Sequence, residues 1–146
     1  MNETKEEITM ANQYIKFTDD PECPYSDLVM VDNQFLFLSG LVSEDLVTGD
    51  LITGDITVET RQVLGNLEMI LKQYGSDMAS VIRVEVLLHD FSERDAMNAE
   101  YAKHFPKDRM PARLCYGGVD LAAGCKIEIM AVARKAEPKP QQRRIL

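Results

Sequence analysis

The sequence predicts an α+β protein in which two helices cover one face of a mixed β-sheet. Three observations lead to this class. Two segments have helical periodicity, an alternating segment separates them, and β-rich runs stand in pairs near both ends of the chain. The length of 146 residues suits one domain. We expect a domain at 12–135, an N-terminal extension at 1–11 and a C-terminal tail at 136–146.

The first part of the domain is expected to hold three short strands. Residues 12–17 form the first, and the β-rich runs at 28–31 and 35–39 flank the turn sequence Asp32-Asn33-Gln34. This arrangement predicts a hairpin, which Gly40 closes. Residues 42–55 contain Gly49 and Gly54 among acidic and threonine residues, and we expect a loop there.

The segment 57–74 changes to helical spacing. Its apolar positions are Val63, Leu64, Leu67, Ile70, Leu71 and Tyr74. Gly75 follows at the place where a left-handed residue commonly ends a helix.

The next two elements are a half-buried strand and a second helix. Residues 81–89 alternate, with Ile82, Val84, Val86 and Leu88 on one face and Arg83 and Glu85 on the other. Ser92 followed by Asp95 predicts a capping box, with Asp in the usual place of Glu. The helix that it opens carries Met97, Tyr101 and Phe105 on one stripe and ends at Pro106.

Residues 107–111 are expected to form a polar loop, and 113–119 and 126–134 two more strands. In the last strand, Ile127 and Ile129 share a face with two alanines, whereas Glu128, Met130 and Val132 share the other. With helices on one face of the sheet, the other face needs cover too. Oligomerisation is the simplest source of that cover.

The charge of the chain opposes two classes of binding function. The net charge of −8 and the pI near 4.7 oppose binding to nucleic acid or to an anionic membrane surface. The basic end of the chain is the one contrary feature, and it contains Arg134, Lys135, Lys139, Arg143 and Arg144.

Metal and secretory signals are lacking in the sequence. The three cysteines form no CxxC pair, and the two histidines stand far apart, so no metal site or disulfide framework is expected. The first ten residues are acidic without an apolar core, and no apolar run reaches the length of a membrane span. We expect a cytoplasmic protein.

Two side chains are candidates for chemistry. Arg113 enters a strand directly after Pro111-Ala112, and its planar guanidinium matches a carboxylate. Glu128 lies on the less apolar face of its strand, where it could act as a general acid/base or orient water. From residue type alone, a surface arginine and a solvated carboxylate are the better explanations of the two.

An ordered set of fragments carries a family resemblance. In chain order they are Pro24-Tyr25, Phe37-Leu38-Ser39-Gly40, Thr60-Arg61-Gln62-Val63-Leu64, Asn66-Leu67, Met97-Asn98-Ala99-Glu100-Tyr101, Pro111-Ala112-Arg113 and Lys126-Ile127-Glu128-Ile129. Together they span residues 14–134 and resemble the Rid family, the reactive intermediate deaminases, also called YjgF-like or endoribonuclease L-PSP proteins.

The resemblance implies a fold and an activity. It implies a chorismate-mutase-like α+β fold and homotrimers whose sheets surround a central barrel, with ligand clefts between subunits. It also implies hydrolysis of enamines and imines, such as 2-aminoacrylate, to 2-keto acids and ammonia, without metal or organic cofactor.

The resemblance assigns roles to individual residues. Arg113 matches the arginine that holds the substrate carboxylate, and Glu128 matches the acidic residue near the attacking water. The pocket positions are Tyr25, Ser39 and Gly40 at the first hairpin, Asn98 on the second helix, and Cys115, whose backbone faces the ligand. Each has a plainer alternative: a hairpin cap for Tyr25, a strand end for Ser39-Gly40, an exposed helix position for Asn98 and a small buried hydrophobe for Cys115.

Three departures from the family pattern bear on the substrate. Leu41 and Met130 stand where the family often has Gln and Glu, and Gly117-Gly118 replaces an ordinary strand sequence. A more apolar pocket would favour a bulkier imino acid. Two other functions remain open: a module that binds a 2-keto acid without turnover and, against the acidic charge, an endoribonuclease.

Overall fold

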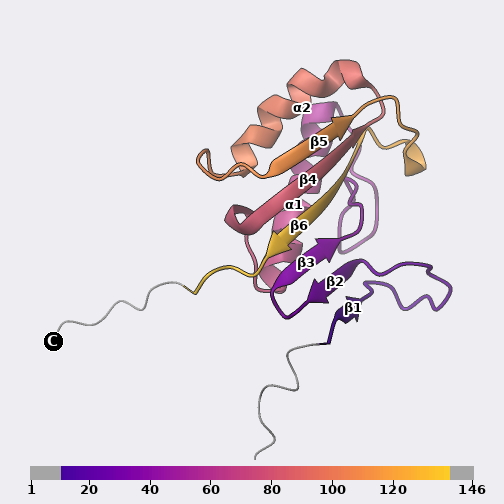
Figure 1. The fold of residues 1–146 in the computed structure, drawn as a ribbon. Helices are drawn as coiled ribbons and strands as arrows, with labels where there is room; N and C mark the ends of the chain where they lie inside the picture. Colours follow the sequence, from indigo (N-terminus) through magenta and orange to yellow (C-terminus); the bar gives the residue numbers. More distant parts are fainter. Residues whose placement is uncertain (1–10, 139–146) are drawn as a thin grey trace, which may run out of the picture.

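The fold is a six-stranded mixed sheet with two α-helices on one face. The computed structural model describes residues 11–138, so parts of the expected extension and tail, residues 1–10 and 139–146, lie outside the described residues. The sheet has the order β1-β2-β3-β6-β4-β5, and Figure 1 shows the long strands β4 and β6 at its centre. The elements are β1 (Gln13–Ile15), β2 (Leu28–Val31), β3 (Phe35–Leu38), α1 (Ile56–Gln73), β4 (Val81–Leu88), α2 (Arg94–Tyr101), β5 (Ala112–Tyr116) and β6 (Ile127–Arg134). The expected α+β class is confirmed.

The connections explain why the sheet is mixed. β4 and β5 are parallel, whereas every other strand pair is antiparallel. A parallel pair needs a crossover connection, and α2 supplies it between β4 and β5. α2 therefore lies over the edge strand that carries Arg113, which fixes one side of the site described below.

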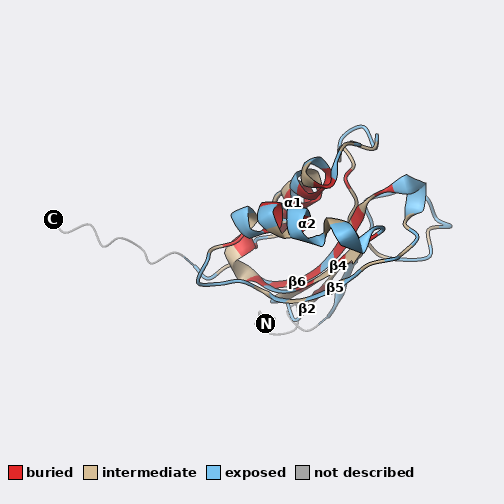
Figure 2. Cartoon of the chain, turned by 90° about the horizontal axis from the view of Figure 1, so that it is seen from above, coloured by how far each residue is buried: buried red, intermediate tan, exposed pale blue. Residues whose placement is uncertain are grey.

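The helices bury one face of the sheet. Val84, Val86, Ile127 and Ile129 point to the helix side and are buried to 1% exposure or less. Figure 2 shows both helices above this face and none on the other side of the sheet. The predicted alternation along β6 is confirmed, because Glu128, Met130 and Val132 are more exposed than their neighbours.

Local sequence signals set both ends of α1. The Asp55 carboxylate accepts a hydrogen bond from the Val58 backbone N–H at 2.9 Å. At the other end, Gly75 has a φ of +80°, and the Ser76 N–H donates to the Leu71 carbonyl at 2.8 Å. This is the helix end expected for Gly75.

The capping box expected at Ser92 and Asp95 is wrong. The Asp90 carboxylate accepts from the Ser92 N–H at 2.9 Å and caps a short 3₁₀ turn, η2 (Phe91–Glu93). That turn runs directly into α2, and the Arg94 N–H donates to the Phe91 carbonyl. The start of α2 therefore obtains acceptors from the preceding backbone and needs no side-chain cap.

The predicted face of Ile82 is also wrong. The pairing of β4 with β6 shifts between Val81 and Arg83, so an extra residue is inserted there. Val81 enters the core, and Ile82 is 43% exposed on the opposite face. β5 ends at Tyr116, three residues earlier than expected, because Gly117 packs against Phe91 and Gly118 has a φ of +70°.

The sheet face away from the helices carries exposed large apolar side chains. They are Phe37, Ile82, Leu114, Tyr116 and Met130. Phe37, Leu114, Tyr116 and Met130 alternate along their strands with residues that point toward the helices. Ile82 stands at the bulge of β4. Within residues 11–138, no helix is long and apolar enough to cross a membrane.

Candidate functional site

Glu128 lies in a cavity of about 480 Å³ at the point where β3 ends and β6 begins. Leu41 and Ile129 exchange both backbone hydrogen bonds, at 2.7 and 3.0 Å, just beyond the end of β3. This pairing brings the Gly40 backbone beside the Glu128 side chain, and both residues line the cavity with Ser39 and Tyr25. Four of the predicted site residues therefore meet here.

Hydrogen bonds fix the segment that carries Tyr25. The Ser39 hydroxyl donates to the Ser26 carbonyl at 2.6 Å, and the Ser39 N–H donates to the Asp27 carbonyl at 2.9 Å. The Ser39 hydroxyl thus has a structural partner next to the cavity. The acidic groups of Cys23 and Asp27 raise the pKa of Tyr25, so its hydroxyl stays protonated and can donate.

A buried carboxylate on α1 supports the walls of this cavity. Glu59 is buried, and its Oε1 accepts from the Ser43 hydroxyl at 3.2 Å and from the Lys126 N–H at 3.0 Å. It therefore joins α1 to the 42–55 loop and to the residue before β6. Glu59 was not among the predicted site residues, although its place four residues before Val63 on the helical stripe was a usable signal.

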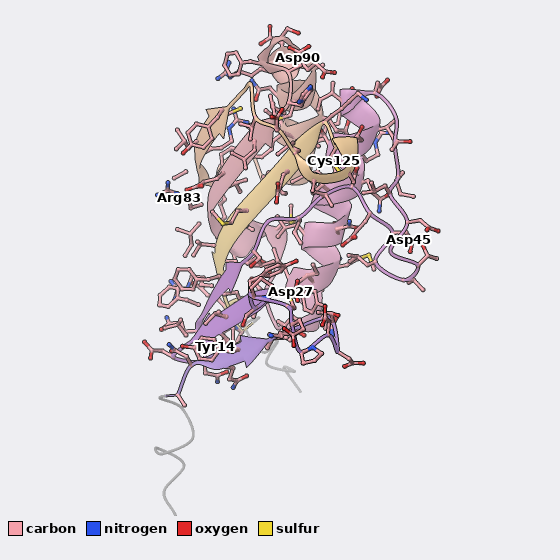
Figure 3. The ribbon with its side chains drawn as sticks, turned by 90° about the vertical axis from the view of Figure 1, so that its right-hand side faces the viewer. Tyr14, Asp27, Asp45, Arg83, Asp90 and Cys125 are labelled. Carbon is pink, nitrogen blue, oxygen red and sulfur yellow. The ribbon has the colours of Figure 1, made fainter. Side chains whose placement is uncertain are left out.

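A larger cavity of about 690 Å³ adjoins the Glu128 cavity. The two share Phe17, Tyr25, Asp27, Glu44 and Leu46, and the larger one extends to Tyr74 at the end of α1. In Figure 3, Asp27 lies near the start of β2, Asp45 on the 42–55 loop and Cys125 beside β6. The loop thus forms part of the wall.

Arg113 occupies a separate cavity of about 290 Å³ between α2 and the segment before β5. Its guanidinium carbon lies 4.7 Å from the centroid of the Tyr101 ring. Within residues 11–138 it makes no ion pair and no side-chain hydrogen bond. The Oδ1 of Asn98 and the hydroxyl of Tyr101, which belong to the same cavity wall, are buried without a hydrogen-bond partner in that part of the chain.

The predicted site residues therefore fall into two groups. Arg113 pairs with Val84 of β4 and points to the helix side, whereas Glu128 pairs with Leu87 and points to the other side. Because the sheet lies between them, one chain does not bring Arg113 and Glu128 into one cavity. Cys115 lines neither cavity; it is half-buried and packs against the core.

Tyr101 is the residue of this site that the sequence analysis read only as core. Its ring is buried as expected, but it also lines the Arg113 cavity. Its position three residues after Asn98 on one helix was the available signal, because residues three apart share a helix face.

Comparisons with known proteins decide the family. The family described as Endoribonuclease L-PSP matches residues 17–135. The chain is 38% identical over 110 residues to the human 2-iminobutanoate/2-iminopropanoate deaminase, covering 75% of this chain and 79% of the human protein. This chain belongs to the Rid, or YjgF-like, family.

Solved structures of Rid relatives have the same fold. A YjgF family member from Neisseria meningitidis is 27% identical, with a TM-score of 0.75, and covers 89% of this chain and 99% of that one. RidA from an Antarctic Psychrobacter species is 26% identical, with a TM-score of 0.73, and covers 84% and 98%.

Proposed function

We propose that this Rid family member hydrolyses the imines and enamines of 2-amino acids to 2-keto acids and ammonia. The observation that carries the proposal is the Arg113 guanidinium, which lines a small cavity without an acidic partner in the described chain. An unpaired arginine in a cavity suits a carboxylate ligand. The similarity to the human 2-iminobutanoate/2-iminopropanoate deaminase supports the same substrate class.

The chemistry needs few groups. Arg113 binds the substrate carboxylate, and Asn98 offers its amide beside it. The carbon of the protonated imine, the iminium, is already electrophilic, so a water adds to it while Glu128 accepts one proton of that water. Glu128 then returns this proton to the amino nitrogen of the tetrahedral adduct. The C–N bond breaks as the adduct's hydroxyl gives its own proton to Glu128 and becomes the carbonyl, and ammonia and the 2-keto acid leave.

The two cavities support a site shared between subunits. In the proposal the Arg113 cavity of one subunit faces the Glu128 cavity of its neighbour in a homotrimer. The exposed apolar side chains of the sheet, among them Leu114 and Met130, would then be covered by the other sheets. Cys115 stands two residues after Arg113 on the same face, where its backbone would border the ligand.

An assay of imine lifetime tests the proposal. An amino acid oxidase generates imines in solution, semicarbazide traps them, and a deaminase slows the appearance of the semicarbazone. We expect slowing by the wild-type protein and none by Arg113→Ala. Arg94→Ala is the matched control, because Arg94 also lies over an aromatic ring, Phe91 at 5.9 Å, but outside the cavities.

The assay also distinguishes a deaminase from a module that binds a 2-keto acid without turnover. A module that only holds a 2-keto acid would use the same Arg113 yet leave the semicarbazone rate unchanged. No slowing by the wild-type protein across small, branched and aromatic imino acids would contradict the deaminase proposal.

A further inference from the structure

We propose that Tyr101 is a positioning residue whose aromatic ring, and not its hydroxyl, orients Arg113 for the substrate carboxylate. The inference rests on the proposed role of Arg113 in carboxylate binding. It adds a residue on α2 to a site otherwise described by a strand arginine and a helix asparagine.

In the described part of the chain, Arg113 is held by an aromatic ring and not by an acid. Two other arginines are fixed by acids: Arg61 by Glu100 at 2.9 Å and Arg83 by Glu85 at 2.9 Å. Arg113 has the Tyr101 ring instead, 4.7 Å from its guanidinium carbon. An acidic partner would consume N–H donors and neutralise the charge. A ring attracts the guanidinium through its face and leaves the N–H donors free for a ligand.

The Tyr101 ring is itself fixed by its packing. Tyr101 is only 6% exposed, and its ring lies 4.8 Å from that of Phe105, centroid to centroid, in a tilted arrangement. Met97, one helical turn earlier, is fully buried beneath the same stripe. A side chain packed in this way presents a rigid platform to Arg113, whereas an unsupported arginine would lose rotamer freedom when it binds.

The Tyr101 hydroxyl is not needed for the contact with Arg113. It is buried and has no hydrogen-bond partner within residues 11–138. Burial raises the pKa of Tyr101 to about 12, with the charge of Arg113 acting in the opposite direction. The phenol therefore stays neutral near pH 7, and no phenolate competes with the substrate for Arg113. The hydroxyl is dispensable for holding the guanidinium.

Two substitutions separate the ring from the hydroxyl. Tyr101→Phe keeps the ring, and Tyr101→Leu removes it. We would measure the Kd of 2-oxobutanoate by calorimetry and the KM and kcat of imine hydrolysis. We expect Tyr101→Leu to raise Kd and KM about 3- to 30-fold, the range of a cation–π contact, with kcat nearly unchanged. Tyr101→Phe should bind like the wild type.

Phe91→Leu is the matched control. It removes an aromatic ring that lies beneath another arginine, Arg94 at 5.9 Å from the ring centroid, and outside the Arg113 cavity, so it should leave Kd unchanged. Wild-type Kd in Tyr101→Leu would overturn the proposal, and so would an equal rise in Tyr101→Phe, because that would assign the contact to the hydroxyl. These outcomes are distinct from failure of the proposed function, in which the wild type itself neither binds 2-oxobutanoate nor hydrolyses imines.

A spectroscopic measurement covers the case in which Tyr101→Leu does not fold. In the wild-type protein, the ring current of Tyr101 should move the side-chain NH signal of Arg113 upfield of other arginines in the NMR spectrum. Tyr101→Phe should keep that shift. An unshifted Arg113 signal in both proteins would contradict the proposed contact.

Discussion

Gly40 lies so close to Glu128 that a Cβ atom at position 40 would stand 2.9 Å from the Glu128 carboxyl carbon and closer still to Oε1. The φ of Gly40 is not in the left-handed region, so the glycine is required by space and not by backbone conformation. The resemblance to Rid proteins assigned Gly40 to the pocket. The structure gives a reason: position 40 sets where the Glu128 carboxylate can lie.

Gly40→Ala should therefore lower deaminase activity by displacing the Glu128 carboxylate. A shift of about 1 Å can cost up to roughly 100-fold in rate, and we expect kcat to fall about 10- to 100-fold. The Kd of 2-oxobutanoate should change little, because Arg113 lies in the other cavity. Gly65→Ala is the control: its new Cβ meets nothing within 4 Å, and alanine favours the helix. Unchanged kcat in Gly40→Ala would remove Glu128 from the chemistry.

A second prediction concerns stability in acid. Glu100 is 3% exposed and joins the two helices through Arg61, with Nε to Oε1 at 2.9 Å, and it also contacts Lys103 and His104. The hydrogen bonds from Arg61 lower the pKa of Glu100 to about 2, against the opposing effect of burial. Because this pKa is lower in the folded than in the unfolded chain, the stabilisation is complete above about 4.5 and is lost as the pH falls toward 2.

Glu100→Gln should accordingly lower the free energy of unfolding at pH 7 by about 1–2 kcal/mol. Arg61 is largely exposed, which keeps the expected loss in the lower part of the range. The difference from wild type should shrink as the pH approaches 2, as measured by urea unfolding at several pH values. Glu68→Gln, which removes an exposed pair with Lys72, should cost under about 0.5 kcal/mol. A constant difference across the pH range would contradict this account.

A third prediction tests the uncovered sheet face. Phe37 is 46% exposed on that face, and a buried carboxylate there would be costly once other subunits cover it. Phe37→Glu should therefore dissociate the proposed homotrimer and abolish imine hydrolysis, as measured by light scattering and the semicarbazide assay. Met69→Glu is the control, because Met69 is 57% exposed on α1, away from the sheet. A monomeric wild-type protein would contradict the trimer.

Periodicity predicted most of the fold because burial on one face leaves a repeating pattern. The core faces of α1 and β6 follow directly from apolar spacing, and Gly75 marked the end of α1. The exposed position of Ile82 was not predicted, because a bulge changes the side on which a residue lies without changing the composition of its strand. The cap of η2 by Asp90 was not predicted, because two residues as close in sequence as Asp90 and Ser92 are compatible with several turn geometries.

The candidate site was less visible from sequence because it depends on contacts between distant elements. Arg113 and Glu128 were candidates from their residue types and strand positions and received roles only through the family resemblance, and no spacing placed them on opposite faces of one sheet. Tyr101 and Glu59 stand on helical stripes, where spacing indicates that a side chain is buried but not which group its polar atom or ring contacts. Only the packing of α2 against β5 shows that Tyr101 faces Arg113.

The separation of Arg113 from Glu128 makes a prediction about mixed oligomers. If each site takes Arg113 from one subunit and Glu128 from a neighbour, Arg113→Ala and Glu128→Gln chains are each inactive alone but complement each other. Unfolding and refolding an equal mixture should create trimers in which some sites combine two intact residues. With random assortment about a quarter of the sites are intact, so roughly a quarter of wild-type activity should return.

The controls for this experiment follow from the same geometry. Mixing the two proteins without unfolding should restore nothing until subunits exchange. A refolded mixture of Arg113→Ala with Arg113→Ala, Glu128→Gln double-mutant chains should stay inactive, because no subunit supplies the arginine. Failure of the refolded single-mutant mixture, with trimers confirmed by light scattering, would mean that one chain supplies both residues. The two cavities would then have to join through a rearrangement of the β5 edge, since the sheet separates them in the present structure.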